Sequence, residues 1–179
     1  LDVVVDDVFV PEHRILRLPD AATSKASGSE AHTNRLYRIS LLTCVPFALA
    51  MPAVAAAAGA LEGFVEENRV RETHGAVVLG GKRIANYQTI QKRIGEAAAR
   101  IDACRVLAQR DVTEAEAEVQ RDAATSLTTR MRNRRTQSFI AYEAQSAMNL
   151  LFEAAGGRCL QYDHPAQRAW RDVSAVNHH

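Results

Sequence analysis

Residues 156–165 read GGRCLQYDHP, and QRAWRD follows at residues 167–172. A glycine pair ends a helix and lets the backbone come close to a ligand or to a neighbouring helix. Pro165 suits the first turn of a new helix, which carries arginine, aspartate and histidine toward Asn177-His178-His179. The stretch therefore predicts a helix end, a turn and a last helix. By spacing alone, this last helix fits both an exposed amphipathic tail and part of a functional site.

Two long helices are expected upstream of this turn. Apolar residues recur at helical spacing from Ile84 to Arg110 and from Leu127 to Ala155. Residues 113–116 read Thr-Glu-Ala-Glu, which has the spacing of a capping box, so we expect the later helix to begin there and to end at Gly156. Residues 74–81, with glycine at both ends of the run, predict a turn-rich linker before the earlier helix.

A further helix is expected between Ile39 and Leu61, where 23 residues carry no charge. This length would suffice to cross a membrane. Pro46 and Pro52 interrupt the run, however, and no basic flank marks one side of it. A buried helix is the better interpretation, and we expect no membrane partner. Its main part should run from about Pro52 to Val70, with Pro46 at a kink or in a shorter preceding helix.

The N-terminal residues predict little helix. Residues 3–5 and 8–10 are apolar, β-branched runs that end at Pro11, which is typical of a strand or the remnant of one. Leu18 to Asn34 show no periodicity and predict a loop. The whole pattern predicts an all-α, four-helix bundle preceded by a short extended N-terminal segment.

Composition limits the function. The chain has 179 residues, 47% of them hydrophobic, with a net charge of +1. It can bury one core, and its charge gives no general attraction for nucleic acid or anionic membrane. Cys44, Cys104 and Cys159 resemble neither a disulfide framework nor a metal site, so we expect no metal and a cytoplasmic location. The arginines at positions 130, 132, 134 and 135 lie on more than one helix face and favour a solvated or subunit-bridging surface over a phosphate site.

Four motifs, in order along the chain, resemble the acyl-CoA dehydrogenase superfamily. Residues 5–11 (VDDVFVP) look like the exit from its β-domain, and residues 71–75 (RETHG) with the later Gln88 are similar to its Arg-x-x-Phe-Gly motif and downstream glutamine. The glycine pair with Pro165 and Arg171-Asp172 resembles its closing segment. The resemblance implies that residues 1–17 end a β-domain and linker, that residues 18–38 form a loop, and that residues 39–179 form a C-terminal helical bundle domain. The start at Leu1 indicates a fragment of a longer protein.

The resemblance also implies a flavin held between the subunits of a homotetramer. Arg71 and Gln88 would contact it from one side, and Gly156 with Gly157 from the other. His74 stands where the dehydrogenases usually have Phe, which is compatible with FMN, with FAD as the alternative. From the residues alone, Arg71 also suits a helix C-terminus and Gln88 the start of the next helix.

One branch of this superfamily comprises two-component flavin monooxygenases, which carry a histidine near the ninth position counted from the arginine of the closing segment. Counting from Arg171 leads to His179. Residues 29–38 also resemble a loop of the aromatic and steroid-ring hydroxylases in this branch. The resemblance therefore implies an oxygenase component that hydroxylates an aromatic or related substrate through a flavin hydroperoxide. Its catalytic residue would be His179, and its partners a flavin reductase and O2.

Two other functions stay open at this point. An acyl-CoA dehydrogenase would oxidise an acyl thioester with FAD, using a carboxylate base in place of the histidine. A helical domain without catalytic residues would serve only to assemble subunits. His178 and His179 also fit the beginning of a purification tag.

Overall fold

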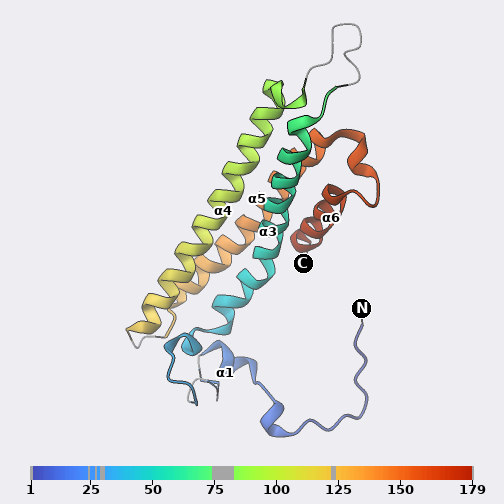
Figure 1. The fold of residues 1–179 in the computed structure, drawn as a ribbon. Helices are drawn as coiled ribbons and strands as arrows, with labels where there is room; N and C mark the ends of the chain where they lie inside the picture. The colour runs from blue at the N-terminus through green and yellow to red at the C-terminus, as the bar shows by residue number, and fades with distance from the viewer. Residues whose placement is uncertain are drawn as a thin grey trace.

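Three long helices form the body of the molecule, as the computed structural model shows for residues 2–23, 25–26, 28, 31–73, 83–121 and 124–178. They are α3 (Leu41–Val70), α4 (Gln88–Gln120) and α5 (Leu127–Ala155). The three run alternately up, down and up, and the shorter α6 (Pro165–Asn177) packs against α3 and α5 (Figure 1). Within the described residues there is no β-strand, only an isolated bridge between Glu72 and Arg83. The predicted all-α, four-helix bundle is confirmed.

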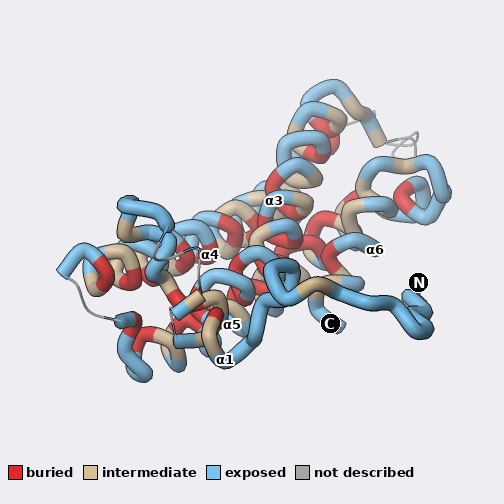
Figure 2. The backbone as a smooth tube through the Cα atoms, turned by 90° about the horizontal axis from the view of Figure 1, so that it is seen from below, coloured by how far each residue is buried: buried red, intermediate tan, exposed pale blue. Residues whose placement is uncertain are grey.

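The core of the bundle combines alanines with a few large side chains. Figure 2 shows the buried residues along the inner faces of the long helices. Ile101, Ile140, Met148 and Leu151 are almost completely buried, and so is Val173 of α6. Alanines between them allow the helix backbones to approach one another closely, and they are also buried: Ala50, Ala53, Ala57, Ala97, Ala144 and Ala147. Burial of these faces is what holds the helices together.

Helix α3 differs from the prediction because it is continuous through both prolines. It begins at Leu41 and not near Pro52, while its end at Val70 agrees. Each proline removes one backbone hydrogen bond, at a cost of about 3 kcal/mol in a helix interior. Packing compensates for this cost, since Pro46 is buried and α3 contacts α4, α5 and α6. By length and composition α3 could cross a membrane, but here it is a core helix of the bundle.

The boundary between α4 and α5 also differs from the prediction. Thr113 does not begin a helix, because it lies inside α4, where its hydroxyl accepts a hydrogen bond from Gln109. The true start of α5 is Leu127, preceded by Ser126, whose side chain accepts from the backbone N–H of Thr129. A Ser/Thr-x-x-Glu pattern can also occur inside a helix, where it does not mark a helix start. The sequence pattern alone therefore predicted the wrong N-cap residue.

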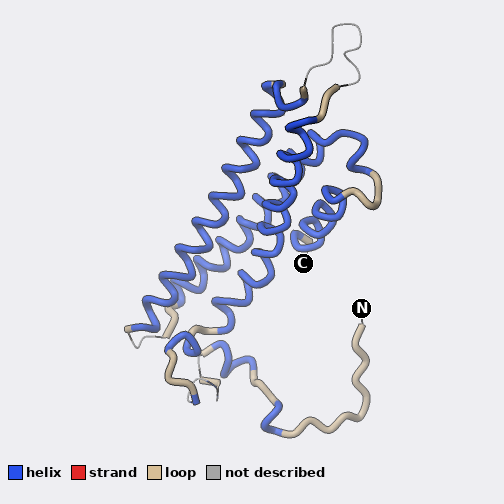
Figure 3. Tube along the Cα trace, in the orientation of Figure 1, coloured by secondary structure: helices blue, strands red, loops and turns tan. Residues whose placement is uncertain are grey.

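The N-terminal region corrects two further expectations. Residues 3–10 form an exposed, extended loop that bends at Asp7, and no strand lies beside them within the described residues (Figure 3). Apolar β-branched residues form a strand only where a partner ladder is available. The predicted loop contains a short helix, α1 (Leu18–Ala22), whose Ala22 carbonyl accepts a hydrogen bond from Ser40 Oγ at 2.8 Å. The predicted linker at residues 74–81 lies outside the described residues.

Candidate functional site

The segment that leaves α3 folds back onto the start of α4. Arg71 is extended, with a ψ of 133°, and its carbonyl accepts a hydrogen bond from the Ile84 N–H at 2.9 Å. Thr73 Oγ1 and the Tyr87 hydroxyl lie 3.3 Å apart. These contacts bring Arg71 to the end of the bundle at which Gln88 begins α4. Gln88 is exposed to solvent at that end.

The glycine pair lies at the same end of the bundle. Gly156 ends α5 with a φ of +73°, a conformation that favours glycine because it lacks a Cβ. Gly156 and Gly157 are both exposed, and a Cβ at either position would meet no atom within 4 Å. The backbone here is therefore open to an approaching ligand.

Arg71 and the glycine pair meet within one chain. Arg71 Nη1 donates a hydrogen bond to the Ala155 carbonyl at 3.4 Å, directly before Gly156. Within one chain they lie side by side, because the end of α3 and the end of α5 lie at the same end of the bundle (Figure 1). The expectation that they contact a flavin from opposite sides of a subunit interface stays a prediction.

Glu67, which sequence analysis did not single out, connects this corner. Its carboxylate lies 3.2 Å from Arg158 Nη1, 3.8 Å from Arg71 Nη1 and 3.7 Å from His164 Nε2. The three partners come from the glycine turn, the end of α3 and the start of α6. A glutamate one turn before Arg71 was the available signal, but many exposed helix glutamates look the same in sequence.

His164 caps the last helix. Its Nδ1 accepts a hydrogen bond from the Ala166 N–H at 3.2 Å, so the neutral ring carries its proton on Nε2, facing Glu67. Pro165 occupies the first turn of α6, which confirms the predicted start of this helix. His164 is mostly buried, with 15% of its side chain exposed.

The Arg171-Asp172 pair and the histidines lie farther along α6. The guanidinium of Arg171 lies over the Tyr162 ring, 4.6 Å from its centroid, and Asp172 lies 3.8 Å from Arg168. His178 is exposed and its Nδ1 lies 2.7 Å from the Ser174 carbonyl of its own helix. His179, the predicted catalytic residue, lies outside the described residues.

A cavity of about 360 Å³ lies between parts of α3 and α6. Its α3 wall combines small residues, about one helical turn apart, with Phe64, and its lining also contains charged groups. The lining residues include Ala56, Gly59, Ala60, Gly63, Glu67, His164 and Asp172. Glu67 and His164 thus border both the glycine corner and this cavity.

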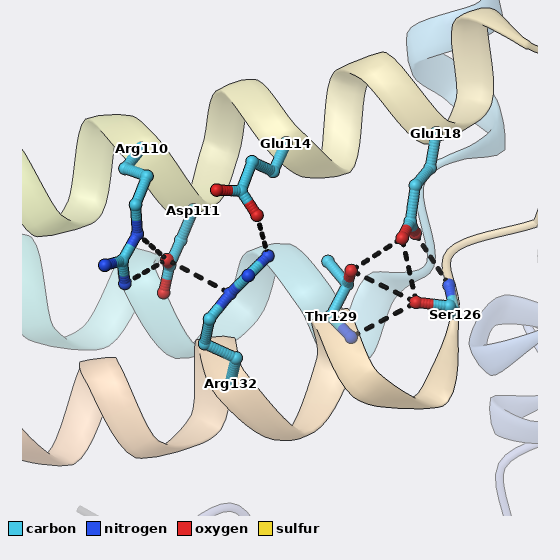
Figure 4. Close-up of polar contacts among 7 residues, drawn as sticks. All are labelled: Arg110, Asp111, Glu114, Glu118, Ser126, Thr129 and Arg132. Atoms are coloured by element: carbon cyan, nitrogen blue, oxygen red, sulfur yellow. Dashed lines mark hydrogen bonds and ion pairs between the residues drawn. The ribbon is translucent and has the colours of Figure 1, made fainter.

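A polar network with a structural role lies at the other end of the bundle (Figure 4). Asp111 is fully buried and accepts from Arg110 at 2.7 and 2.9 Å. Arg132 of α5 pairs with both Asp111 and Glu114 of α4. Arg132 is therefore an internal bridge between helices, unlike the solvated or subunit-bridging role expected for its arginine run. Arg130 and Arg134 of this run border a second cavity, of about 400 Å³, between α3 and α5.

The same end of the bundle holds a carboxylate that caps a neighbouring helix. Glu118 of α4 accepts from the Ser126 N–H and Oγ and from Thr129 Oγ1, at 2.7, 2.8 and 2.6 Å. Burial raises the pKa of Glu118, but these hydrogen bonds outweigh burial and lower it below its ordinary value. This group fixes the turn between α4 and α5.

The cysteines have no partner of their own kind. Cys44, Cys104 and Cys159 are free thiols. Burial raises the pKa of Cys104 to about 11, which keeps this thiol protonated. Among the described residues, no three His, Cys, Asp or Glu side chains are grouped to bind a metal ion.

These features define a helical bundle domain with a cationic, glycine-lined corner at one end. Residues 47–179 match the family of the acyl-CoA dehydrogenase C-terminal domain, and the chain belongs to this family. The resemblance seen in the closing segment is thereby confirmed.

The relatives include oxygenase components. The chain is 41% identical to the oxygenase component of the FADH2-dependent resorcinol hydroxylase from Rhizobium sp. (strain MTP-10005), over 99% of the chain and 44% of that protein. It is 32% identical to the oxygenase subunit HsaA from Rhodococcus jostii (strain RHA1), over 99% and 46%. The solved structure of the 3-HSA hydroxylase from Rhodococcus sp. RHA1 matches with a TM-score of 0.87 at 30% identity, over 98% of the chain and 45% of the other. The chain thus spans less than half the length of these relatives.

Proposed function

We propose that this chain is the C-terminal helical domain of the oxygenase component of a reduced-flavin-dependent monooxygenase. The observation that supports the activity is the 41% identity to a resorcinol hydroxylase oxygenase component along 99% of the chain. The substrate is an aromatic or related small molecule, and the second substrate is O2. A separate flavin reductase supplies the reduced flavin. The acyl-CoA dehydrogenase and pure assembly functions are less well supported, since neither matches the names of these relatives.

The cationic corner suits the phosphate of such a flavin. Arg71 and Arg158 provide two guanidinium groups, which bind phosphate oxygens through charged hydrogen bonds. The exposed backbone at Gly156 and Gly157 allows close approach, and Gln88 offers an amide at the same end. The relative with 41% identity is named for FADH2, which favours FAD over the FMN suggested by His74. A bound reduced flavin would supply the electrons with which O2 is activated.

In this proposal, the catalytic residue that the chain supplies is His179, which follows α6 in the sequence. The helix is anchored by Trp170, whose Nε1 donates to Asn149 Oδ1 at 2.9 Å, and by the buried Val173. His179 follows directly after the His178 that caps α6. From Arg171 to the helix end at Asn177, six residues at 1.5 Å rise correspond to about 9 Å of helix. An imidazole there would hold or accept a proton near neutral pH, as hydroxylation of a phenol requires.

The test uses His179→Ala and His178→Ala in the full-length protein. A proton-transfer residue contributes about 10²–10⁴-fold to rate. We expect His179→Ala to hydroxylate poorly and to release hydrogen peroxide in place of product. His178, bonded to its own helix, is the matched control and should stay near wild type. Equal and intact coupling of flavin oxidation to product in both variants would contradict the role of His179.

A further inference from the structure

We propose that Glu67 is a positioning residue for the flavin phosphate, which holds Arg71 and the glycine turn in the arrangement that receives it. This inference rests on the proposed function. Glu67 is on the last turn of α3, and its side chain is 31% exposed. Its carboxylate joins the end of α3, on which it lies, to the turn that follows α5 and to the start of α6.

The charges of the corner favour this role. One carboxylate faces two guanidinium groups, so these three groups together carry a net positive charge. A carboxylate that fully neutralised its partners would compete with a phosphate. Here it orders two arginines and still leaves the corner cationic, which is what binding of an anion needs.

The arrangement of the hydrogen-bond donors of Arg71 also supports the positioning role of Glu67. Both of its side-chain contacts among the described residues, to Glu67 and to the Ala155 carbonyl, use Nη1. Among the described residues, no contact occupies its Nε or Nη2. A guanidinium that is held through one nitrogen, while its other nitrogens have no partner, is oriented for bidentate binding of phosphate oxygens. Only 24% of the Arg71 side chain is exposed, so its position is constrained by packing as well.

The glycine turn is held by the same carboxylate. Arg158 directly follows Gly157, and its contact with Glu67 is the shortest of the three, at 3.2 Å. Neither glycine has a side chain with which to fix the turn. The ion pair from Arg158, together with the Cys159 thiol that donates to the Gly156 carbonyl at 2.8 Å, restricts the backbone that would approach the phosphate.

Three possible roles of Glu67 make different predictions. If Glu67 only neutralised positive charge, its removal would strengthen the binding of a phosphate-bearing flavin. If it positions Arg71 and the turn, its removal weakens that binding although the corner becomes more positive. A purely structural role would weaken the binding of riboflavin, which has no phosphate, by the same factor. The change in affinity for phosphate-bearing flavins, compared with the change for riboflavin, therefore distinguishes the three roles.

The experiment compares Glu67→Gln with Glu66→Gln in the full-length protein. Glu66 is the matched control because, within the described part of the chain, its one ion pair is with Arg69, at 3.1 Å, on an exposed face. Dissociation constants of reduced FAD, FMN and riboflavin are measured without O2. Loss of one charged hydrogen bond between Arg71 and the flavin phosphate corresponds to about tenfold in affinity or more. We expect Glu67→Gln to weaken FAD and FMN by about tenfold and riboflavin by less than twofold, with Glu66→Gln unchanged.

Other outcomes would contradict the positioning role of Glu67 or the proposed function. Unchanged or tighter binding of FAD and FMN to Glu67→Gln would overturn the positioning role, and so would an equal loss for all three flavins. Hydrogen exchange of residues 156–163 without flavin gives a second readout, and we expect it to be faster in Glu67→Gln. Failure of the wild type to bind any reduced flavin would refute the proposed function itself, which the comparison of variants alone would not do.

Discussion

Arg71 is the residue whose role is most open to a direct test. The structure gives it a local partner in the Ala155 carbonyl, and the proposed function gives it a phosphate. We expect Arg71→Ala in the full-length protein to weaken binding of reduced flavin by about 10- to 100-fold, because hydrogen bonds to charged groups contribute about 1.5–3 kcal/mol. Arg69→Ala is the control, since Arg69 is 66% exposed. Isothermal titration measures both, and equal affinities would contradict the assignment.

Cys104 provides a second test at the scale of one residue. It is fully buried, its thiol donates to the Ile140 carbonyl at 3.7 Å, and its pKa is raised to about 11. Only the thiolate reacts rapidly with a thiol reagent. At pH 8 in the folded protein we therefore expect Cys44, which is exposed, to be labelled well before Cys104. Peptide mass spectrometry after timed alkylation gives the order, and early labelling of Cys104 would show that this part of the bundle opens.

At the scale of the helices, the cap of α5 is the clearest stability determinant. Ser126 accepts from the Thr129 N–H and also donates to Glu118. Loss of such a cap costs about 0.5–2 kcal/mol. We expect Ser126→Ala to lower the urea midpoint of the full-length protein, while Thr113→Ala, inside the exposed face of α4, changes it little. The reverse order would restore Thr113 as the cap predicted from sequence.

Because of Glu118, the stability that this turn contributes depends on pH. Its pKa is lower in the folded state than the ordinary value of 4.5, because hydrogen bonds from Thr129 and Ser126 outweigh burial. A lowered carboxyl pKa contributes stability that is present above the unfolded pKa and lost as pH falls through the folded pKa. We expect Glu118→Gln to destabilise the protein at pH 7 and to match the wild type more closely below about pH 4. Urea unfolding at several pH values tests this, and a difference independent of pH would contradict it.

At the scale of the whole molecule, we predict a homotetramer. Large apolar side chains stay exposed on the bundle, among them Leu42, Leu127, Met131, Phe139 and Tyr142. Leu42, Leu127 and Met131 line one cavity together, and contiguous exposed apolar surface is typical of interaction sites. Sedimentation equilibrium of the full-length protein should therefore give four times the mass of one chain. A monomer at micromolar concentration would contradict the prediction.

The sequence predicted the helices well where their periodicity was long and their ends were chemically marked. The ends of α3 at Val70 and of α5 at Gly156, and the start of α6 at Pro165, agree with the structure. It failed where local chemistry was ambiguous. Pro46 and Pro52 lie inside a helix because packing outweighs their cost, and the strand expected at residues 3–10 lacks a partner in the described structure.

Sequence by itself determined the family and the residue types of the candidate site, because Arg71, the glycine pair and the Arg171-Asp172 pair have a recognisable order and spacing. Only the tertiary structure decided which of them meet. Arg71 contacts the residue before Gly156 although 84 positions separate Arg71 and Ala155, and Glu67 joins both to His164. Such contacts depend on how three helices are aligned by their buried faces, and no local pattern encodes that alignment.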